Sequence, residues 1–268
     1  MKEKIEAFKE YLVEEERSEN TIDNYLYAVN EYFKRYEELT KPNLIEFKQR
    51  LFEEGKAAKT VNNRCVAINQ FCRYLGKPEL CVKTVKIHRA SSVENVITLE
   101  EYNRLIGGLK EDGKEKDYWM IKFLAKTGAR VSEFTRLTKD GLDKGYCEMW
   151  TKGKIRRIYI PSSLAEESKE YFKKVEGNLL FPSRYGGEMT SKGVASAIDR
   201  MAKKYQIRTE VMHPHSFRHL FAIEFLKNNN NISLLADLMG HASVDTTAIY
   251  LKLSREEQMR QFNEASRW

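Results

Sequence analysis

Two histidines, an arginine and a tyrosine that could act together on a phosphate lie within residues 213–252. They are His215, Arg218, His241 and Tyr250. A tyrosine phenol, with a pKa of ~10, is a weak nucleophile until a base or a cluster of cations stabilises its oxyanion. An arginine offers a planar fork of donors that matches two phosphate oxygens, and a histidine can donate to another oxygen or move a proton. Together these residue types predict phosphoryl chemistry, although each of them alone could be a packing residue.

Short helices must bring these side chains together. Apolar residues recur at helical spacing between positions 217 and 225, so His215 and Arg218 should share one helix face. A polar cluster should end this helix, and two more short helices are expected over residues 233–239 and 244–251. The last of them would carry Tyr250 near the end of a small, poorly anchored element.

The length and the charge of the chain limit the classes of protein to which it can belong. Its 268 residues favour two domains, each large enough for its own core. A net charge of +7 and a pI near 9.0 favour a polyanionic partner such as DNA or RNA. No apolar run approaches the ~20 residues needed to cross a bilayer, and the N-terminal stretch is charged throughout. We therefore expect a cytoplasmic protein without a membrane segment.

The cysteines and the histidine cluster give no strong metal signal. The four cysteines form no CxxC pair and show no zinc spacing, which predicts reduced thiols in a cytosolic protein. His213, His215 and His219 could hold zinc by their spacing, but no cysteine or carboxylate completes that set. No metal is predicted.

Residues 1–80 are predicted to form a bundle of four helices, because apolar residues recur in four stripes separated by cap signals. The fourth helix, over residues 60–75, should turn Val66 inward and Asn69 outward. Residues 81–97 lack periodicity and read as an extended basic linker. The helix and the linker carry basic and amide side chains that could contact DNA, although a solvated face is an equally good interpretation: Lys59, Asn62, Asn63, Arg64, Lys83, Lys86 and Arg89.

Residues 98–268 are predicted to form the second domain, mainly α with a small β-sheet (α+β). A capping-box pattern, Thr98 to Glu101, should begin its first helix. Further along, Gly128 permits a tight turn that places Arg130 at the entrance of a short helix, a position that favours anions.

Two strands should follow, over residues 146–150 and 155–160, with Lys152 and Lys154 at the turn between them. Helices over residues 162–175 and 191–205 lead to the histidine segment. A last helix after Ser254 offers Met259 and Phe262 for packing.

Four segments of the chain, in this order, resemble the conserved motifs (boxes) of the tyrosine recombinase (phage integrase) family. The resemblance covers most of residues 98–252 and rests on four segments: TGARVSEFTRL at 127–137, KGKIRRIYIP at 152–161, PHSFRHLFA at 214–222 and LMGHASVDTTAIY at 238–250. Each box alone is weak, but four of them in family order are specific. The helical bundle is similar in length and helix count to the family's core-binding (SAM-like) domain.

The resemblance implies a mechanism. Tyr250 would attack a DNA phosphate, displace the 5′-hydroxyl and form a 3′-phosphotyrosine link. The arginines would hold the phosphate oxygens, His241 would donate to the same phosphate and His215 would assist proton transfer at the tyrosine. Lys152, with Lys154 as the alternative, would protonate the leaving oxygen, and Glu133 would orient the site. One phosphodiester replaces another, so no cofactor is required.

The resemblance also implies partners. These would be double-stranded DNA recombination sites, a homotetramer assembled by exchange of the C-terminal helix, and possible accessory proteins. Nothing precedes the bundle that could bind remote arm sites, which favours a simple Xer-like or invertase-like recombinase. A type IB topoisomerase, which uses the same chemistry without exchanging partners, and a catalytically silent DNA-binding protein are the alternatives.

Overall fold

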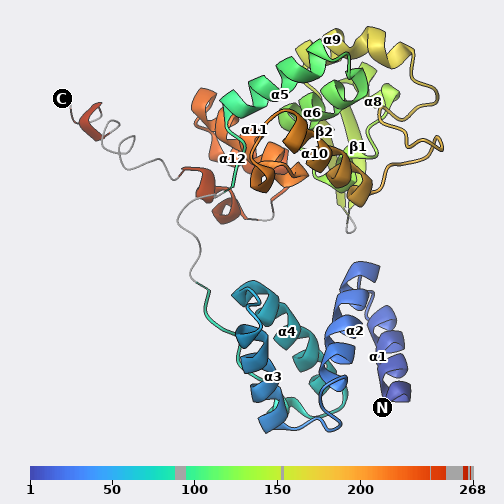
Figure 1. Cartoon of the computed structure of the whole chain (residues 1–268), viewed down its shortest axis with the longest axis vertical. Helices are drawn as coiled ribbons and strands as arrows, with labels where there is room; N and C mark the ends of the chain where they lie inside the picture. Colours follow the sequence, from blue (N-terminus) through green and yellow to red (C-terminus); the bar gives the residue numbers. More distant parts are fainter. Residues whose placement is uncertain (88–94, 152–153, 242, 252–261, 265, 267–268) are drawn as a thin grey trace. The chain divides into compact units, whose positions relative to one another are not determined.

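The computed structural model describes residues 1–87, 95–151, 154–241, 243–251, 262–264 and 266. The chain divides into two compact units: unit 1, Met1–Arg89, and unit 2, Ala90–Trp268 (Figure 1). Both are built mainly of helices, and the described residues contain one two-stranded sheet. The predicted fold class, mainly α with a small sheet, is therefore confirmed.

Unit 1 is a helical bundle in which α2 packs against both α1 and α4, and α3 packs against α4. Aromatic and aliphatic side chains form its core, with Phe8 and Phe71 in edge-to-face contact 5.0 Å apart. Its elements are α1 (Lys2–Glu14), α2 (Glu19–Phe33), α3 (Lys41–Glu53), α4 (Ala58–Tyr74) and the 3-10 turn η1 (Pro78–Leu80).

Two predictions about the faces of α4 were wrong. Val66 is 43% exposed, whereas Asn69 is only 7% exposed. The Asn69 side-chain amide donates to the Val82 carbonyl and accepts from the Val82 amide, both at 2.8 Å. Asn62 makes the same pair of bonds with Val85. The segment after η1 is thus held along α4 by two asparagines seven positions apart. Each side-chain amide satisfies the backbone N–H and C=O of one valine, as a neighbouring strand would.

Unit 2 contains eight helices of α type and one hairpin among its described residues. The predicted capping box is confirmed at its start, where Thr98 and Glu101 exchange side-chain and backbone hydrogen bonds. Its elements are α5 (Leu99–Glu111), α6 (Glu115–Thr127), α7 (Val131–Phe134), α8 (Lys139–Lys144), β1 (Tyr146–Thr151), β2 (Lys154–Tyr159), α9 (Ser162–Lys173), α10 (Ser191–Lys204), η2 (Thr209–Val211), α11 (Pro214–Asn228), α12 (Ile232–Met239), η3 (Val244–Thr246) and η4 (Ala248–Leu251).

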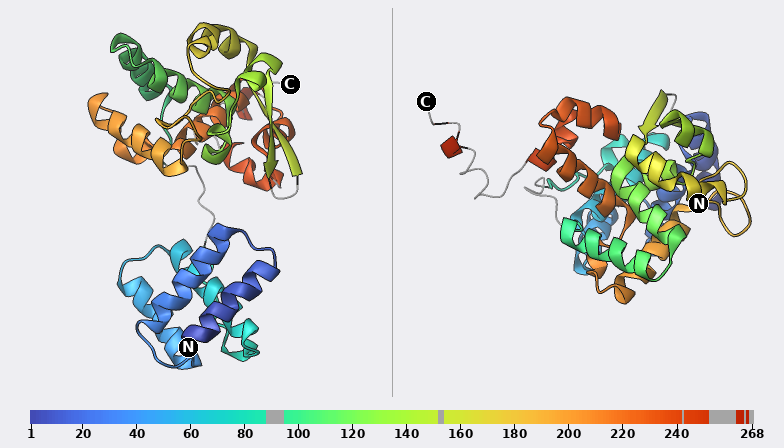
Figure 2. Two further views of the ribbon diagram at one scale, coloured as in Figure 1. Left: turned by 90° about the vertical axis from the view of Figure 1, so that its right-hand side faces the viewer. Right: turned by 90° about the horizontal axis from the view of Figure 1, so that it is seen from above.

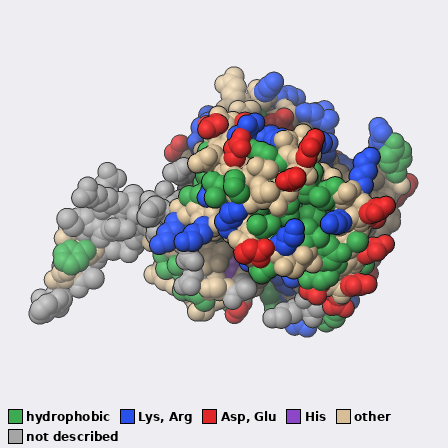
Figure 3. All heavy atoms as spheres, turned by 90° about the horizontal axis from the view of Figure 1, so that it is seen from below, with side chains coloured by type: hydrophobic (Ala, Val, Ile, Leu, Met, Phe, Trp, Pro, Cys, Tyr) green, Lys and Arg blue, Asp and Glu red, His purple; other side chains and the backbone are tan. Residues whose placement is uncertain are grey.

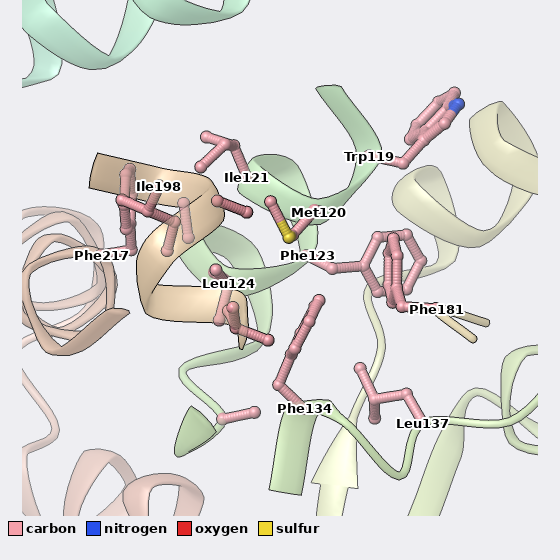
Figure 4. Packing of buried hydrophobic residues seen from close by; sticks show 14 of the residues in the cluster. Trp119, Met120, Ile121, Phe123, Leu124, Phe134, Leu137, Phe181, Ile198 and Phe217 are labelled. Atoms are coloured by element: carbon pink, nitrogen blue, oxygen red, sulfur yellow. The ribbon is translucent and has the colours of Figure 1, made fainter. Parts of the chain in front are cut away.

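The core of unit 2 fixes the helices that carry the predicted site residues. α11 packs along α6. Figure 4 shows Phe134 of α7 beside Phe181 and Phe123, and the Phe134 and Phe181 rings stack with centroids 4.6 Å apart. Phe217 of α11 is fully buried in the same cluster. The short helix α7 is therefore held by one buried aromatic residue, which determines where Arg130 can lie.

The hairpin stands at the edge of unit 2 (Figure 2) and pairs antiparallel, with Tyr146 opposite Tyr159 and Met149 opposite Arg156. Side chains alternate between its faces. Met149 and Ile158 are buried, whereas Trp150 and Ile155 are 68% and 63% exposed. Arg156 is thus on the face that packs against the domain.

Two further predictions were a helix after Ser254 and the absence of a membrane segment. Most of the helix predicted after Ser254, including Met259, lies outside the described residues, and Phe262 is 65% exposed. In the part of the chain that the structure describes, no helix is both long enough and apolar enough to cross a bilayer.

Candidate active site

Arg218 is a buried cation on α11. Only 1% of its surface is exposed, and it donates to the carbonyl oxygens of Gly128, at 2.6 Å, and Met239, at 2.5 Å. Its buried Nε has no acceptor among the described residues. Burial and the nearby guanidiniums of Arg130 and Arg156 lower the pKa of Arg218 to about 10, so it remains charged at neutral pH. A buried cation with an unused donor suits an anion.

Arg130 lies between α6 and α7 and is held by two acceptors. Its guanidinium donates to Glu133 Oε1 at 3.0 Å and to the Gly240 carbonyl at 2.8 Å. The turn before it needs Gly128, which has φ +61° and would place a Cβ 2.5 Å from the Phe221 ring. Gly128 therefore sets the backbone path that leads to Arg130, and Glu133 positions the Arg130 side chain.

The two arginines meet at the C-terminus of α12. Arg218 donates to Met239 and Arg130 to Gly240, which are adjacent residues. Carbonyl groups at a helix end carry partial negative charge that attracts cations. Two guanidiniums from different segments thus converge on one spot.

Arg156 on β2 is a third cation at this place, and the sequence analysis did not identify it. It forms an ion pair with Glu133 Oε1 and donates to the Leu238 carbonyl at 2.7 Å. Burial raises the pKa of Glu133, but the hydrogen bond from the Arg130 amide and the charges of Arg156 and Arg130 outweigh it and hold the pKa below its ordinary value. Glu133 is therefore an anion shared by two arginines.

His241 lies just beyond α12. Its Nε2 is 3.1 Å from the Arg218 guanidinium and its Nδ1 is 2.8 Å from the Thr247 hydroxyl. Because guanidinium nitrogens only donate, Nε2 accepts and we assign the ring proton to Nδ1. Burial and then the charges of Arg218 and Arg130 lower the pKa of His241 to about 4, so the ring is neutral at pH 7.

Tyr250 lies in η4, and the prediction that its element is poorly anchored was wrong. The residues predicted as one helix form two 3-10 turns, η3 and η4, and Tyr250 is only 9% exposed. Its ring packs with Ala222, Leu226, Leu235 and Met239. Burial raises the pKa of Tyr250 to about 12, opposed by the charge of Arg218. The free protein therefore holds a protonated phenol.

The residue next to the Tyr250 hydroxyl is His219 and not His215. His219 Nδ1 lies 2.5 Å from Tyr250 Oη. His215 is one helical turn away, and its ring meets that of His219 edge-on with centroids 4.2 Å apart. The two histidines share one face of α11, as four-residue spacing requires.

Arginine, histidine and tyrosine side chains of this site line one pocket of about 490 Å³, which Glu133 and Arg156 do not line. Five of the six residues predicted to be catalytic contribute to it: Arg130, His215, Arg218, His241 and Tyr250. The sixth, Lys152, lies outside the described residues, and the side chain of its alternative, Lys154 at the start of β2, is also not described. Among the described residues, no group of three or more acidic, histidine or cysteine side chains could hold a metal ion.

The residues predicted to contact DNA divide into two groups. Lys59, Asn63, Lys83 and Lys86 are exposed, and Arg89 lies outside the described residues. Asn62 and Arg64 instead serve the fold, because Asn62 holds Val85 and Arg64 binds Glu31 at 2.8 Å. On the face drawn in Figure 3, basic side chains alternate with acidic and apolar ones. Charge alone therefore does not locate a DNA-binding surface there.

The sequence contained signals for the two residues that were missed. Arg156 lies two positions before Ile158 in a strand, which places the two side chains on the same face. His219 follows His215 by four positions in a helix, which places both on one face. Neither pattern alone predicts the partners of these side chains, Glu133 for Arg156 and Tyr250 for His219.

The chain matches two family models. Residues 95–257 match the phage integrase family, and residues 5–78 match the phage integrase N-terminal SAM-like domain.

Named relatives cover different shares of the chain. The tyrosine recombinase XerA of Thermococcus onnurineus is 29% identical and aligns with 98% of this chain and 95% of its own length. XerD of Staphylococcus haemolyticus is 24% identical over 72% of this chain and 69% of its own length. For XerC of Listeria innocua, which is 30% identical, the chain spans 57% of that protein.

Solved structures share the fold. The Tn1549 transposon integrase in complex with transposon right end DNA superposes with a TM-score of 0.77 at 18% identity, over 98% of both chains. The XerH site-specific recombinase bound to difH substrate gives 0.68 at 21% identity, over 89% of this chain and 78% of that one.

Proposed function

The chain belongs to the phage integrase family, and we propose that it is a tyrosine recombinase that cuts and rejoins double-stranded DNA through a covalent link between Tyr250 and a 3′-phosphate. The observation that carries this proposal is the shared pocket, where two guanidiniums, three imidazoles and one phenol line the same space. Relatives along nearly the whole chain are tyrosine recombinases, and the Tn1549 and XerH structures hold recombination DNA.

The proposed reaction exchanges one phosphodiester for another. Tyr250 Oη attacks the phosphorus, the bond to the 5′-oxygen breaks, and the DNA keeps a 3′-phosphate bound to the protein. Negative charge on the non-bridging oxygens is met by Arg130 and by Arg218, whose buried Nε has no acceptor in the described part of the chain. Preorganised donors of this kind typically supply the largest share of rate enhancement in phosphoryl transfer. The energy of the broken ester is kept in the new one, so neither ATP nor a cofactor is needed.

The remaining polar groups complete the proposed chemistry. A phosphate in the pocket offsets the cations that lower the pKa of His241, which would let its Nε2 gain a proton and donate to the phosphate. Lys152, or Lys154 in its place, protonates the leaving 5′-oxygen from the hairpin. Glu133 is a positioning residue, since it holds Arg130 by both its backbone amide and its guanidinium.

We assign recognition of DNA to both parts of the chain. In this proposal residues 1–80 form a core-binding domain, residues 81–97 join it to the catalytic domain at 98–268, and exposed Lys59, Asn63, Lys83 and Lys86 contact the phosphate backbone. Four copies assemble on two recombination sites through the C-terminal helix, with accessory proteins as further partners.

A nicked suicide substrate tests the function. The duplex is chosen from DNA flanking the gene by its binding to the Tyr250→Phe variant, and the nick lets the released strand diffuse away and trap the adduct. The wild-type protein should form a covalent protein–DNA complex, and Tyr250→Phe should bind equally well but form none. A bound duplex that gives no wild-type adduct, or an adduct with Tyr250→Phe, contradicts the proposal. Strand exchange between two such sites would separate a recombinase from a topoisomerase.

A further inference from the structure

His219 is hydrogen-bonded to the proposed nucleophile. Its Nδ1 lies 2.5 Å from Tyr250 Oη, within hydrogen-bonding distance. Both residues line the pocket that holds the two arginines. No other hydrogen bond of the Tyr250 hydroxyl is seen among the described side chains.

The packing around the two rings holds this contact in place. η4 packs against α11, and the Tyr250 ring sits in the apolar cluster formed by α11 and α12. The His219 ring also meets His215 edge-on, at 4.2 Å and 73°. The imidazole thus contacts both the His215 ring and the phenol.

Both partners in this hydrogen bond are uncharged in the free protein. Burial lowers the pKa of His219 to about 4, aided by the positive charge that His215, His213, Arg218 and His241 can carry. The imidazole is therefore neutral, whereas the phenol keeps its proton. We assign the phenol O–H as the donor to Nδ1, which places the ring proton of His219 on Nε2.

We propose that His219 is a catalytic residue that accepts the proton of Tyr250 Oη as the phenol attacks the DNA phosphate. This inference rests on the proposed function and assigns to His219 the proton transfer that the family resemblance gave to His215. As the Oη–phosphorus bond forms, the proton moves to Nδ1. The bond to the 5′-oxygen breaks, and that oxygen takes its proton from the hairpin lysine.

DNA supplies what the free protein lacks for this step. A free phenol and a neutral imidazole of low pKa exchange a proton unfavourably. A phosphate brought beside Arg218 and His241 adds negative charge, which favours the imidazolium form of His219. The proton transfer is therefore coupled to DNA binding, and Tyr250 stays protonated until a phosphate arrives.

Two substitutions of His219 distinguish its two roles, which are to accept a hydrogen bond from the phenol and to take the phenol's proton. In His219→Asn, the amide oxygen occupies nearly the place of Nδ1 and can accept the hydrogen bond but cannot take the proton. His219→Leu can do neither. Under single turnover on the suicide substrate, both variants should form adduct more slowly by roughly 10²- to 10⁴-fold, with DNA binding unchanged. A ring-fluorinated tyrosine at position 250, whose phenol is more acidic, should restore part of the rate in His219→Asn.

A change of the leaving group distinguishes proton transfer from Tyr250 from proton transfer to the 5′-oxygen. A substrate with sulfur in place of the bridging 5′-oxygen needs no proton on its leaving group, so it should rescue a Lys152→Ala or Lys154→Ala variant but not His219→Asn. Wild-type cleavage by His219→Asn, or its rescue by the sulfur substrate, would overturn the proposal. If His219→Leu does not fold, His219→Asn alone still decides it. Absence of adduct with the wild-type protein would instead refute the proposed function.

Discussion

Arg130 and Arg156 donate to the same carboxylate oxygen, Oε1 of Glu133. Arg156 reaches it from the hairpin, whereas Arg130 reaches it from the turn before α7. Arg156 also binds the Leu238 carbonyl in the last turn of α12, beside the carbonyls that Arg218 and Arg130 use. One buried carboxylate therefore joins the hairpin, where the proposed proton donor lies, to the arginines that would bind the phosphate.

Arg156→Met should reduce both stability and cleavage. Removing one partner of a buried ion pair typically costs about 3 kcal/mol, because the other charge loses its compensation. Arg157→Met is the matched control, since Arg157 follows it in the same strand but pairs with Glu148 at a site where both side chains are about half exposed. That change should cost less than about 1 kcal/mol. Urea unfolding and adduct formation measure the two effects, and equal losses in both variants would refute this role.

Gly240→Ala should disturb the site through Arg156. A Cβ at Gly240 would lie 2.4 Å from Arg156 Nε, and this guanidinium cannot move without losing Glu133 and Leu238. Gly113→Ala is the control, because Gly113 has a similar φ, +63° against +59°, and open space around it. The control should lose about 1 kcal/mol from backbone strain alone.

The extra cost at Gly240 should be about 1–3 kcal/mol from steric overlap, with slower cleavage. In an Arg156→Ala background, which lacks the Cδ and Nε atoms that the new Cβ would meet, Gly240→Ala should cost no more than Gly113→Ala. An undiminished cost in that background would show that the overlap with Arg156 is not the cause.

His241 should titrate far below an ordinary histidine. Burial and the charges of Arg218, Arg130, Arg156 and His215 lower its pKa to about 4. A lowered pKa means that the neutral ring contributes stability above pH ~6.5, which is lost as the pH falls toward 4. Histidine NMR signals of the DNA-free protein should therefore show no titration of His241 near pH 6.5, and bound DNA should raise its pKa. A midpoint of ~6.5 without DNA would refute the proximity of these cations.

Glu101→Gln should destabilise the protein in a pH-dependent way. The hydrogen bonds from Arg208 are the main cause that lowers the pKa of Glu101 to about 2. A carboxyl whose pKa is lowered by folding stabilises the protein above its unfolded pKa, and this contribution is lost as the pH falls toward 2. Because Arg208 is half exposed, we expect a loss of about 1–2 kcal/mol at pH 7.

The difference between Glu101→Gln and the wild-type protein should shrink below pH ~4. Exposed Glu100→Gln should change stability by less than about 0.5 kcal/mol at either pH. A pH-independent loss in Glu101→Gln would mean that shape, and not charge, matters at this position.

Local patterns predicted much of the fold and of the site. The capping box at Thr98, the hairpin and the helix that carries His215 and Arg218 all depend on residues close in sequence, and all are present. The four segments that resemble the family also contain Arg130 and Tyr250. The structure places both residues in the same pocket as His215 and Arg218.

What the sequence did not predict depends on how distant segments meet. Asn69 was expected on the surface because its burial requires the chain to return along α4 thirteen positions later. The partner of the phenol depends on the place where η4 docks on α11, which decides in favour of His219 over His215. Arg156 is buried because α12 covers the hairpin face, and strand alternation alone does not reveal that cover.

Identification of the amino acid that carries DNA tests the central claim most directly. The trapped adduct is digested with nuclease and trypsin, and the modified peptide is sequenced by mass spectrometry. Peptide 228–252 contains a single tyrosine, and Tyr250 should carry a nucleotide linked through its 3′-phosphate. A nucleotide on any other residue, or linked through a 5′-phosphate, would contradict the account.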